Sequence, residues 1–146
     1  MSPKPARTAR PSAVIVDVDG TLAIITDRSP YSHQGVLKDK PNAPVIAVAR
    51  ALASAGHTLV IVSGRSELAR ADTELWLARH LEVPFEGPYM RPIRDDRKDE
   101  AIKREIYDRE IKPRFDVLCV LDDRDQVVHM WRQLGLTCLQ VAPGDF

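Results

Sequence analysis

The chain has 146 residues, a length typical of one globular domain, and 44% of them are hydrophobic. Its 21 basic and 21 acidic side chains cancel to a formal net charge of +0, which excludes the overall basicity of many nucleic-acid-binding proteins. No apolar run reaches the roughly 20 residues of a membrane-spanning helix, and the first residues lack the apolar stretch of a signal peptide. We therefore expect one cytoplasmic domain with no membrane segment, in which any polyanion is bound by local charge.

Residues 1–12 are typical of a flexible basic tail, because Lys4, Arg7 and Arg10 lie among prolines and small residues. A solvated tail without function and a weak electrostatic tether for nucleic acid are both open interpretations. The predicted domain occupies residues 13–146.

After the tail, short apolar runs alternate with segments of helical periodicity. Five runs have the length and composition of strands, the central ones rich in branched residues and free of polar alternation, as in buried parallel strands. The predicted strands are residues 13–18 (AVIVDV), 57–62 (HTLVIV), 88–91, 116–121 (DVLCVL) and 138–142. The predicted helices are residues 44–55, 66–81, 98–111 and 124–134. This alternation predicts an α/β fold with a doubly wound, mainly parallel five-stranded sheet.

Two further segments complete this plan. Residues 24–43 carry loop punctuation and too little periodicity for a crossover helix, so we interpret them as a small flap over one edge of the sheet. Cys119 and Cys138 lie in apolar runs without C-x-x-C spacing, which favours buried thiols over a disulfide or a redox pair. The four histidines lack ligand spacing, so zinc is not indicated.

Polar residues lie at or directly after the ends of three of the predicted strands, at the edge where doubly wound sheets bind their ligands. These residues are Asp17 and Asp19, then Ser63, Gly64 and Arg65, then Asp122, Asp123 and Arg124. Three ionised carboxylates, those of Asp17, Asp122 and Asp123, cannot stay together without a cation. Hard oxygen ligands favour Mg²⁺, so we expect a magnesium site at this edge.

The spacing of the first two aspartates favours phosphoryl transfer. A bound cation screens the phosphate charge, which lets Asp17 attack phosphorus as a nucleophile. Asp19 can protonate the leaving oxygen and then activate the water that cleaves the acyl phosphate. The supporting residues are Gly20 and Thr21 in the turn, and Ser63 with Arg65 for the phosphate oxygens.

Asp99 and Lys103 are four residues apart on one predicted helix, so the carboxylate can aim the ammonium group at the phosphoryl group, although an ordinary surface pair is the alternative. A calcium loop is excluded, because Gly20 comes at the fourth position of the motif and not at the sixth. A receiver-type phosphoacceptor domain is disfavoured, because its order of aspartates is the reverse of the one found here.

These residues resemble the motifs of the haloacid dehalogenase superfamily of phosphotransferases. The sequence DVDGT at 17–21 is similar to its first motif, Ser63 to its second, Lys103 to its third, and LDDR at 121–124 to its fourth. Over residues 13–146 the chain resembles the phosphatase domain of bacteriophage polynucleotide kinase/phosphatases, most specifically in DDRDQVVHMWR and the final GDF.

The resemblance implies a role for each matching residue. Asp17 is the expected nucleophile and Asp19 the general acid and base, with Arg65 and Lys103 as further catalytic residues. The expected substrate-binding residues are Thr21, Arg28, Ser63, Gly64, Arg65, Asp99 and Lys103, with Asp99 orienting Lys103. The expected magnesium ligands are Asp17, Asp19, Asp122 and Asp123.

The implied activity is Mg²⁺-dependent removal of 3′-phosphate, or of 2′,3′-cyclic phosphate, from DNA or RNA ends in nucleic-acid repair. Full-length members of the family carry a P-loop kinase domain, but this sequence contains no G-K-[ST], so we expect no kinase activity. Separate kinase or ligase partners and a homo-oligomer are compatible with the sequence.

Two alternative functions, and two interpretations of the basic residues, stay open at this point. A small-molecule or nucleotide phosphatase of the same superfamily and a noncatalytic module that binds nucleic-acid ends are the alternatives. The basic residues that can hold a nucleic-acid backbone also read as a solvated face of mixed charge. They are Arg28, Arg91, Arg94, Arg97, Lys98 and Arg104.

Overall fold

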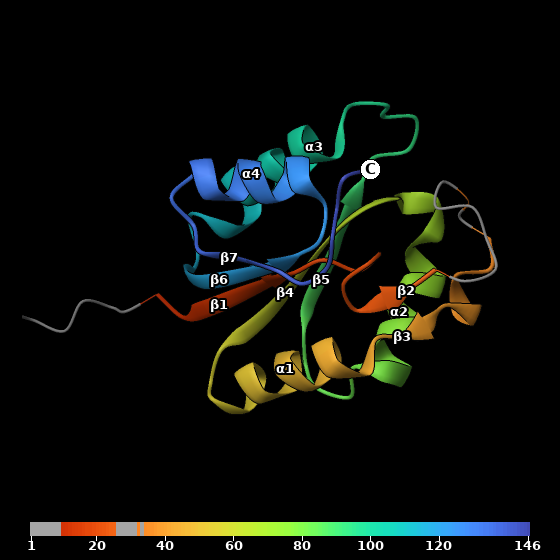
Figure 1. Cartoon of the computed structure of the whole chain (residues 1–146), viewed down its shortest axis with the longest axis horizontal. Helices are drawn as coiled ribbons and strands as arrows, with labels where there is room; N and C mark the ends of the chain where they lie inside the picture. Colours follow the sequence, from red (N-terminus) through yellow and green to blue (C-terminus); the bar gives the residue numbers. More distant parts are fainter. Residues whose placement is uncertain (1–9, 26–31, 33) are drawn as a thin grey trace, which may run out of the picture.

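The computed structural model describes residues 10–25, 32 and 34–146. Its centre is a five-stranded parallel sheet with the strand order β5-β4-β1-β6-β7 (Figure 1). The strands are β1 (Ser12–Val16), β4 (Thr58–Ser66), β5 (Glu86–Arg91), β6 (Asp116–Asp122) and β7 (Cys138–Gln140). The predicted doubly wound α/β fold is therefore confirmed.

Helices cover both faces of this sheet: α1 and α2 lie on one face, and α3 and α4 lie on the other (Figure 1). Their bounds are Ala43–Ser54 (α1), Arg70–His80 (α2), Asp99–Ile106 (α3) and Asp125–Gln133 (α4). A 3₁₀ turn, Glu67–Ala69, precedes α2, and a π-helical turn, Tyr107–Ile111, extends α3. Within the described residues, no helix combines the length and the apolar content needed to cross a bilayer.

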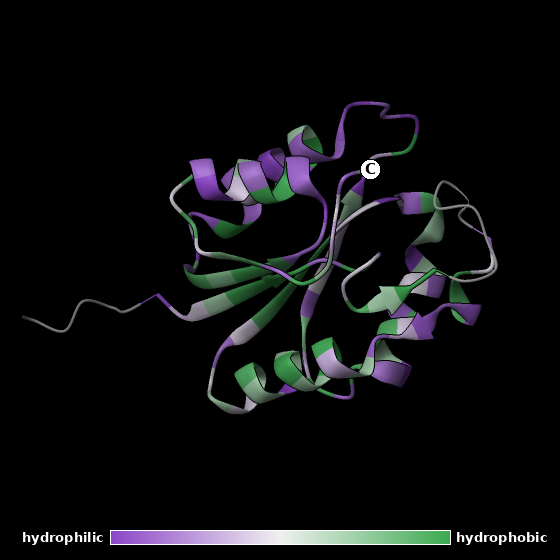
Figure 2. Cartoon of the chain, viewed as in Figure 1, coloured by the Kyte–Doolittle hydropathy of each residue, from purple (hydrophilic) through white to green (hydrophobic). Residues whose placement is uncertain are grey.

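The alternation of side chains along each strand sends them to two separate cores. Ile15 of β1 packs in the core beneath α3 and α4 with Trp131, whereas its neighbour Val14 packs beneath α1 and α2 with Trp76. All four of these side chains are buried. Because both faces are covered, the middle parts of the central strands β1, β4 and β6 are mostly hydrophobic, as Figure 2 shows. The predicted buried thiols, Cys119 and Cys138, are also confirmed.

The chain joins the sheet slightly before the predicted domain boundary. β1 begins at Ser12, and the Pro11 carbonyl accepts a hydrogen bond of 3.0 Å from the Asp116 N–H. Residues 1–9 of the predicted tail lie outside the described residues.

The two ends of the predicted flap lie side by side. β2 (Ala23–Ile24) and β3 (Lys40–Pro41) form a small antiparallel sheet, and a 3₁₀ turn, Val36–Lys38, lies between them in the chain. Val36 is fully buried and packs with Ala69 and Met90. The middle of the flap, residues 26–31 and 33, lies outside the described residues.

One predicted strand is longer than expected. Ser63, Gly64 and Arg65 were expected to follow the second strand, but they lie within β4, which continues to Ser66. The extension exists because Ser66 pairs with Arg91 of β5. These residues therefore have strand geometry at the edge where the ligand is expected.

Candidate active site

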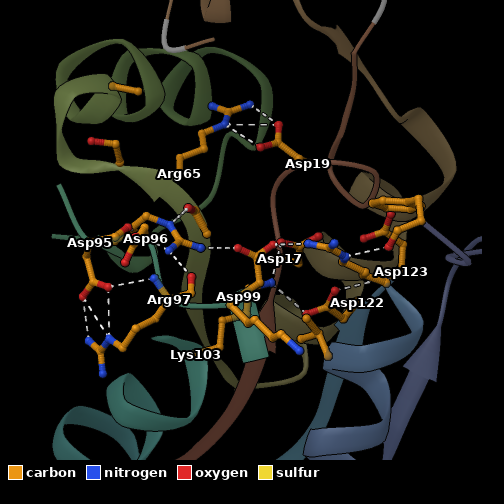
Figure 3. A pocket seen from close by; sticks show the side chains of 18 of the residues that line it. Asp17, Asp19, Arg65, Asp95, Asp96, Arg97, Asp99, Lys103, Asp122 and Asp123 are labelled. Atoms are coloured by element: carbon orange, nitrogen blue, oxygen red, sulfur yellow. Dashed lines mark hydrogen bonds and ion pairs between the residues drawn. The ribbon is translucent and has the colours of Figure 1, made fainter. Parts of the chain in front are cut away.

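The carboxyl ends of β1, β4 and β6 open into a cavity of about 500 Å³ (Figure 3). Most of the residues that the sequence singled out line it, although they come from four separate segments. They are Asp17, Asp19, Gly64, Arg65, Asp99, Lys103, Asp122 and Asp123. Ser63 is buried and accepts a 3.1 Å hydrogen bond from the Arg65 N–H, and Arg28 lies outside the described residues.

Three buried carboxylates meet at the base of the cavity. Asp17, Asp122 and Asp123 each offer one oxygen atom, and these three atoms lie within 4.8 Å of one another. Burial raises the pKa of Asp17 well above its ordinary value, and the negative charge of Asp122 raises it further. Burial likewise raises the pKa of Asp123. A cluster of this kind is unfavourable when ionised unless positive charge compensates it.

Lys103 supplies part of that compensation. Its Nζ atom donates to Asp17 Oδ1 at 2.8 Å and to Asp122 Oδ2 at 2.9 Å. Burial alone would lower the pKa of Lys103, but the charges of Asp122 and Asp17 outweigh burial and raise it, so the amine stays protonated. Three carboxylates still face one ammonium group, and oxygen donors at this spacing fit a hard divalent cation.

Asp19, the fourth predicted metal ligand, does not belong to this cluster. Its carboxylate is instead held by Arg65, whose Nε atom lies 2.9 Å from Asp19 Oδ2. The same guanidinium donates to Asp39 Oδ2 at 2.9 Å and to Thr73 Oγ1 at 3.0 Å. Arg65 was predicted to bind phosphate oxygens, and the geometry adds a second role, which is to fix the position of Asp19.

Asp39 and Thr73 were not predicted as site residues. Asp39 belongs to the flap sequence, and its carboxylate reaches an arginine 26 positions further along the chain. Its carbonyl also accepts a 2.9 Å hydrogen bond from the Trp76 indole, which ties the base of the flap to α2. No local pattern marks either residue, since each acquires its contact only when separate elements pack.

The predicted pairing of Asp99 with Lys103 is wrong. Asp99 accepts a 2.9 Å hydrogen bond from Arg124 Nη1 and a short one from Arg91 Nη2, whereas Lys103 reaches the buried carboxylates. Asp99 is the first residue of α3, where the end of β5 and the start of α4 bring both arginines within reach. Gly64 makes room for this carboxylate, because a Cβ atom there would lie 2.6 Å from Asp99 Oδ1.

Trp131 packs in the core beneath α3 and α4, and its indole also contacts the acidic cluster. Its Nε1 atom donates to Asp122 Oδ2 at 3.2 Å, while Asp122 Oδ1 accepts a 2.8 Å hydrogen bond from the Asp123 N–H. With Lys103, these contacts fix both oxygens of Asp122. The sequence signal was ambiguous, because a tryptophan on an apolar helix face is typical of a core.

The basic residues that could hold a nucleic-acid backbone lie only partly in the cavity wall. Of the described ones, Arg91, Arg97 and Lys98 line the cavity, and Arg94 and Arg104 do not. Arg97 is already paired with Asp95 at 2.7 Å and with Glu105 at 2.5 Å. The loop before α3 is therefore a surface of mixed charge, mostly hydrophilic in Figure 2.

The turn between β1 and β2 brings Asp17 and Asp123 together. Thr21 Oγ1 donates to Asp17 Oδ2 at 2.8 Å, which fixes the second oxygen of that carboxylate. Gly20 has a φ of +78°, and a Cβ atom at this position would lie 2.0 Å from Asp123 Oδ2. The turn thus requires glycine both for its backbone conformation and for the close approach of Asp123.

Gly20→Ala is therefore expected to destabilise the protein more than Gly135→Ala. Both glycines have a positive φ, +78° and +85°, so both variants carry backbone strain of about 1–3 kcal/mol. Only Gly20→Ala also displaces a carboxylate, because nothing lies within 4 Å of a Cβ atom at Gly135. Urea unfolding measures the difference, and equal losses in the two variants would contradict the close approach.

The chain is similar in sequence to known proteins. A family model described as polynucleotide kinase PNKP phosphatase domain matches residues 11–146. A putative bifunctional polynucleotide kinase/RNA ligase of Autographa californica nuclear polyhedrosis virus is 33% identical over 128 residues, which make up 86% of this chain and 18% of the viral protein.

The chain is also similar to proteins of solved structure. A chain of the Pnkp1/Rnl/Hen1 complex is 40% identical and superimposes with a TM-score of 0.91, over 96% of this chain and 49% of that chain. A class C acid phosphatase from Bacillus anthracis, with tungstate bound, has a TM-score of 0.60 and 14% identity over 94% of this chain and 68% of that chain, and so shares the fold. The chain spans about half the length of the Pnkp1-complex chain and less than a fifth of the viral protein.

Proposed function

Because the chain belongs to the family of polynucleotide kinase PNKP phosphatase domains, we propose that it is a Mg²⁺-dependent phosphatase that removes 3′-phosphate groups from DNA or RNA ends. The observation that carries the proposal is the buried cluster of Asp17, Asp122, Asp123 and Lys103 at the base of an open cavity. Burying several like charges together costs free energy, so such a cluster is typical of a site that binds a metal ion and an anionic substrate.

The residues present fit a magnesium ion. Asp17, Asp122 and Asp123 would hold it, since their oxygens converge and their negative charge exceeds that of Lys103. When bound, the ion would screen the charge of the phosphoryl group. Asp19 would not supply a carboxylate ligand in this arrangement, because Arg65 holds that group.

The chain's own residues divide the remaining work. Thr21 and Lys103 hold the two oxygens of Asp17, which leaves that carboxylate aimed and buried at the cavity base. An Asp17 oxygen forms a bond to phosphorus while the bond from phosphorus to the 3′ oxygen breaks. Lys103 stabilises the negative charge that develops on the phosphoryl oxygens.

Asp19 handles the protons in both steps. Arg65 holds the Asp19 side chain at the cavity wall, where the protonated carboxyl group gives its proton to the departing 3′ oxygen and becomes the carboxylate paired with Arg65. In the second step Asp19 takes a proton from water, the water oxygen bonds to phosphorus, and the bond between phosphorus and Asp17 breaks. Inorganic phosphate leaves, and both aspartates return to their starting state.

The decisive assay compares three substrates with and without Mg²⁺: a 3′-phosphorylated oligonucleotide, its 5′-phosphorylated isomer and glucose 6-phosphate. We expect release of phosphate from the 3′ end at a kcat/KM at least about 10²-fold above the other two, and only with the metal. Equal turnover of all three would favour the small-molecule phosphatase. Binding of oligonucleotide without turnover would favour the noncatalytic module.

We also propose that the protein works beside separate kinase and ligase activities. The relatives support this, since one is described as a kinase/RNA ligase and another comes from a complex with Rnl and Hen1. RNA repair is accordingly the proposed setting. Activity on 2′,3′-cyclic phosphate is a further outcome that the same assay measures with a cyclic-phosphate end.

A further inference from the structure

An exposed aromatic side chain lines the cavity and takes no part in the chemistry above. Phe146 is 62% exposed, yet it lies in the same cavity wall as Asp122, Asp123 and Arg124. Among the large hydrophobic residues that are exposed in the described part of the chain, Phe146 has the highest exposed fraction and is the sole aromatic residue. The others do not line the cavity: Ile24, Val48, Leu68, Leu75, Ile93, Leu118 and Leu139.

Arg124 holds Phe146 by two contacts. Its Nε atom donates to the main-chain oxygen of Phe146 at 2.8 Å, and its guanidinium carbon lies 5.3 Å from the centre of the ring. Arg124 is itself fixed by Asp99, at 2.9 Å. A cation behind one side of an aromatic ring is a favourable arrangement that leaves ring surface available for a second partner.

The segment that carries Phe146 is packed against the residues of the acidic cluster. A Cβ atom at Gly144 would lie 1.8 Å from the Asp123 carbonyl oxygen, so the two backbones are in direct contact. The Gly144 carbonyl accepts a 2.8 Å hydrogen bond from the Asp125 N–H, and the Gln140 side chain donates to the Asp123 carbonyl at 2.9 Å. The position of Phe146 is therefore set by the same strand end that places Asp123.

We infer that Phe146 is a stacking platform for the nucleobase next to the phosphate that enters the cavity; this inference rests on the proposed function. A nucleobase presents a flat apolar face, and stacking on an aromatic side chain is favourable for all four bases. Phe146 has no polar atom in its side chain, so it binds the base without reading its identity. Arg124 adds positive charge beside the platform, where the nucleic-acid backbone passes.

The test uses Phe146→Ala and Phe146→Trp in the full chain, with Leu75→Ala as the control. Leu75 is also exposed but lies on α2, outside the cavity wall. Each variant is assayed on three substrates: a 3′-phosphorylated oligonucleotide, the same oligonucleotide with a stable abasic residue at the 3′ end, and acetyl phosphate. Circular dichroism melting shows whether each variant is folded.

Phe146→Ala should raise KM for the ordinary oligonucleotide by roughly 5- to 20-fold more than for acetyl phosphate, and Phe146→Trp should restore it. On the abasic end the excess should vanish, because no base remains to stack. Equal effects of Phe146→Ala on the ordinary and abasic ends would overturn the platform. If the wild-type protein hydrolyses acetyl phosphate but no 3′ end, the proposed function fails instead, and the two failures are thereby distinguished.

Discussion

Asp17→Asn is expected to lower the turnover of a 3′-phosphorylated oligonucleotide by more than about 10³-fold without loss of the fold. An amide cannot form the acyl phosphate, and no other described carboxylate has its oxygens held by both Thr21 and Lys103. Rapid-quench assays measure the residual rate. Activity near the wild-type level would remove Asp17 from the role of nucleophile.

The melting temperature separates this chemical effect from misfolding. Asn has almost the same shape as Asp, and it removes one of three buried negative charges while Lys103 keeps its contact with Asp122. In metal-free buffer the variant should therefore melt at or above the wild-type temperature. Asp116→Asn is the matched control, since Asp116 is exposed at the opposite end of β6, and it should leave the rate unchanged.

The fold could be predicted because a strand that is buried on both faces of a sheet has an apolar sequence without polar alternation. Apart from Asp17 and Asp116, the runs AVIVDV and DVLCVL are apolar, and they became β1 and β6 with small shifts at their ends. The C-terminal part of β4 has no such apolar sequence. Ser63, Gly64 and Arg65 are not an apolar run, and their strand conformation comes from pairing with β5, which is a property of the tertiary structure.

The residues of the candidate site likewise include some that the sequence predicted and some that it did not. Asp17 and Asp122 could be predicted because Asp17 directly follows β1, Asp122 is the last residue of β6, and parallel strands bring their carboxyl ends to one edge. The hydrogen-bond partners of Asp99 could not be predicted from the sequence. Helical spacing suggested Lys103, whereas the fold brings Arg91 and Arg124 from two other elements to the start of α3. Contacts between side chains of distant segments leave no periodic signal.

The second large effect is expected from Lys103→Met, which removes the ammonium group held by Asp17 and Asp122 and leaves three buried carboxylates. Breaking a buried pair from one side destabilises a protein by about 3–5 kcal/mol, and we expect a loss of this size at pH 7.5 in metal-free buffer. Turnover should fall by more than about 10²-fold, because charge on the phosphoryl oxygens is no longer neutralised. Urea unfolding and the end-phosphate assay measure the two effects.

The loss of stability should depend on pH in a defined direction. Burial already raises the pKa of Asp17 and of Asp123, so the folded state binds more protons than the unfolded state in the range above the ordinary value of 3.8. Stability from these groups is therefore present at low pH and is lost as pH rises through the folded pKa. Without the ammonium group this dependence steepens, so the variant should regain stability at pH 5, and Mg²⁺ should restore it at pH 7.5. Lys112→Met, at an exposed lysine, should show neither response, and a loss in Lys103→Met that is the same at both pH values would contradict the charge balance.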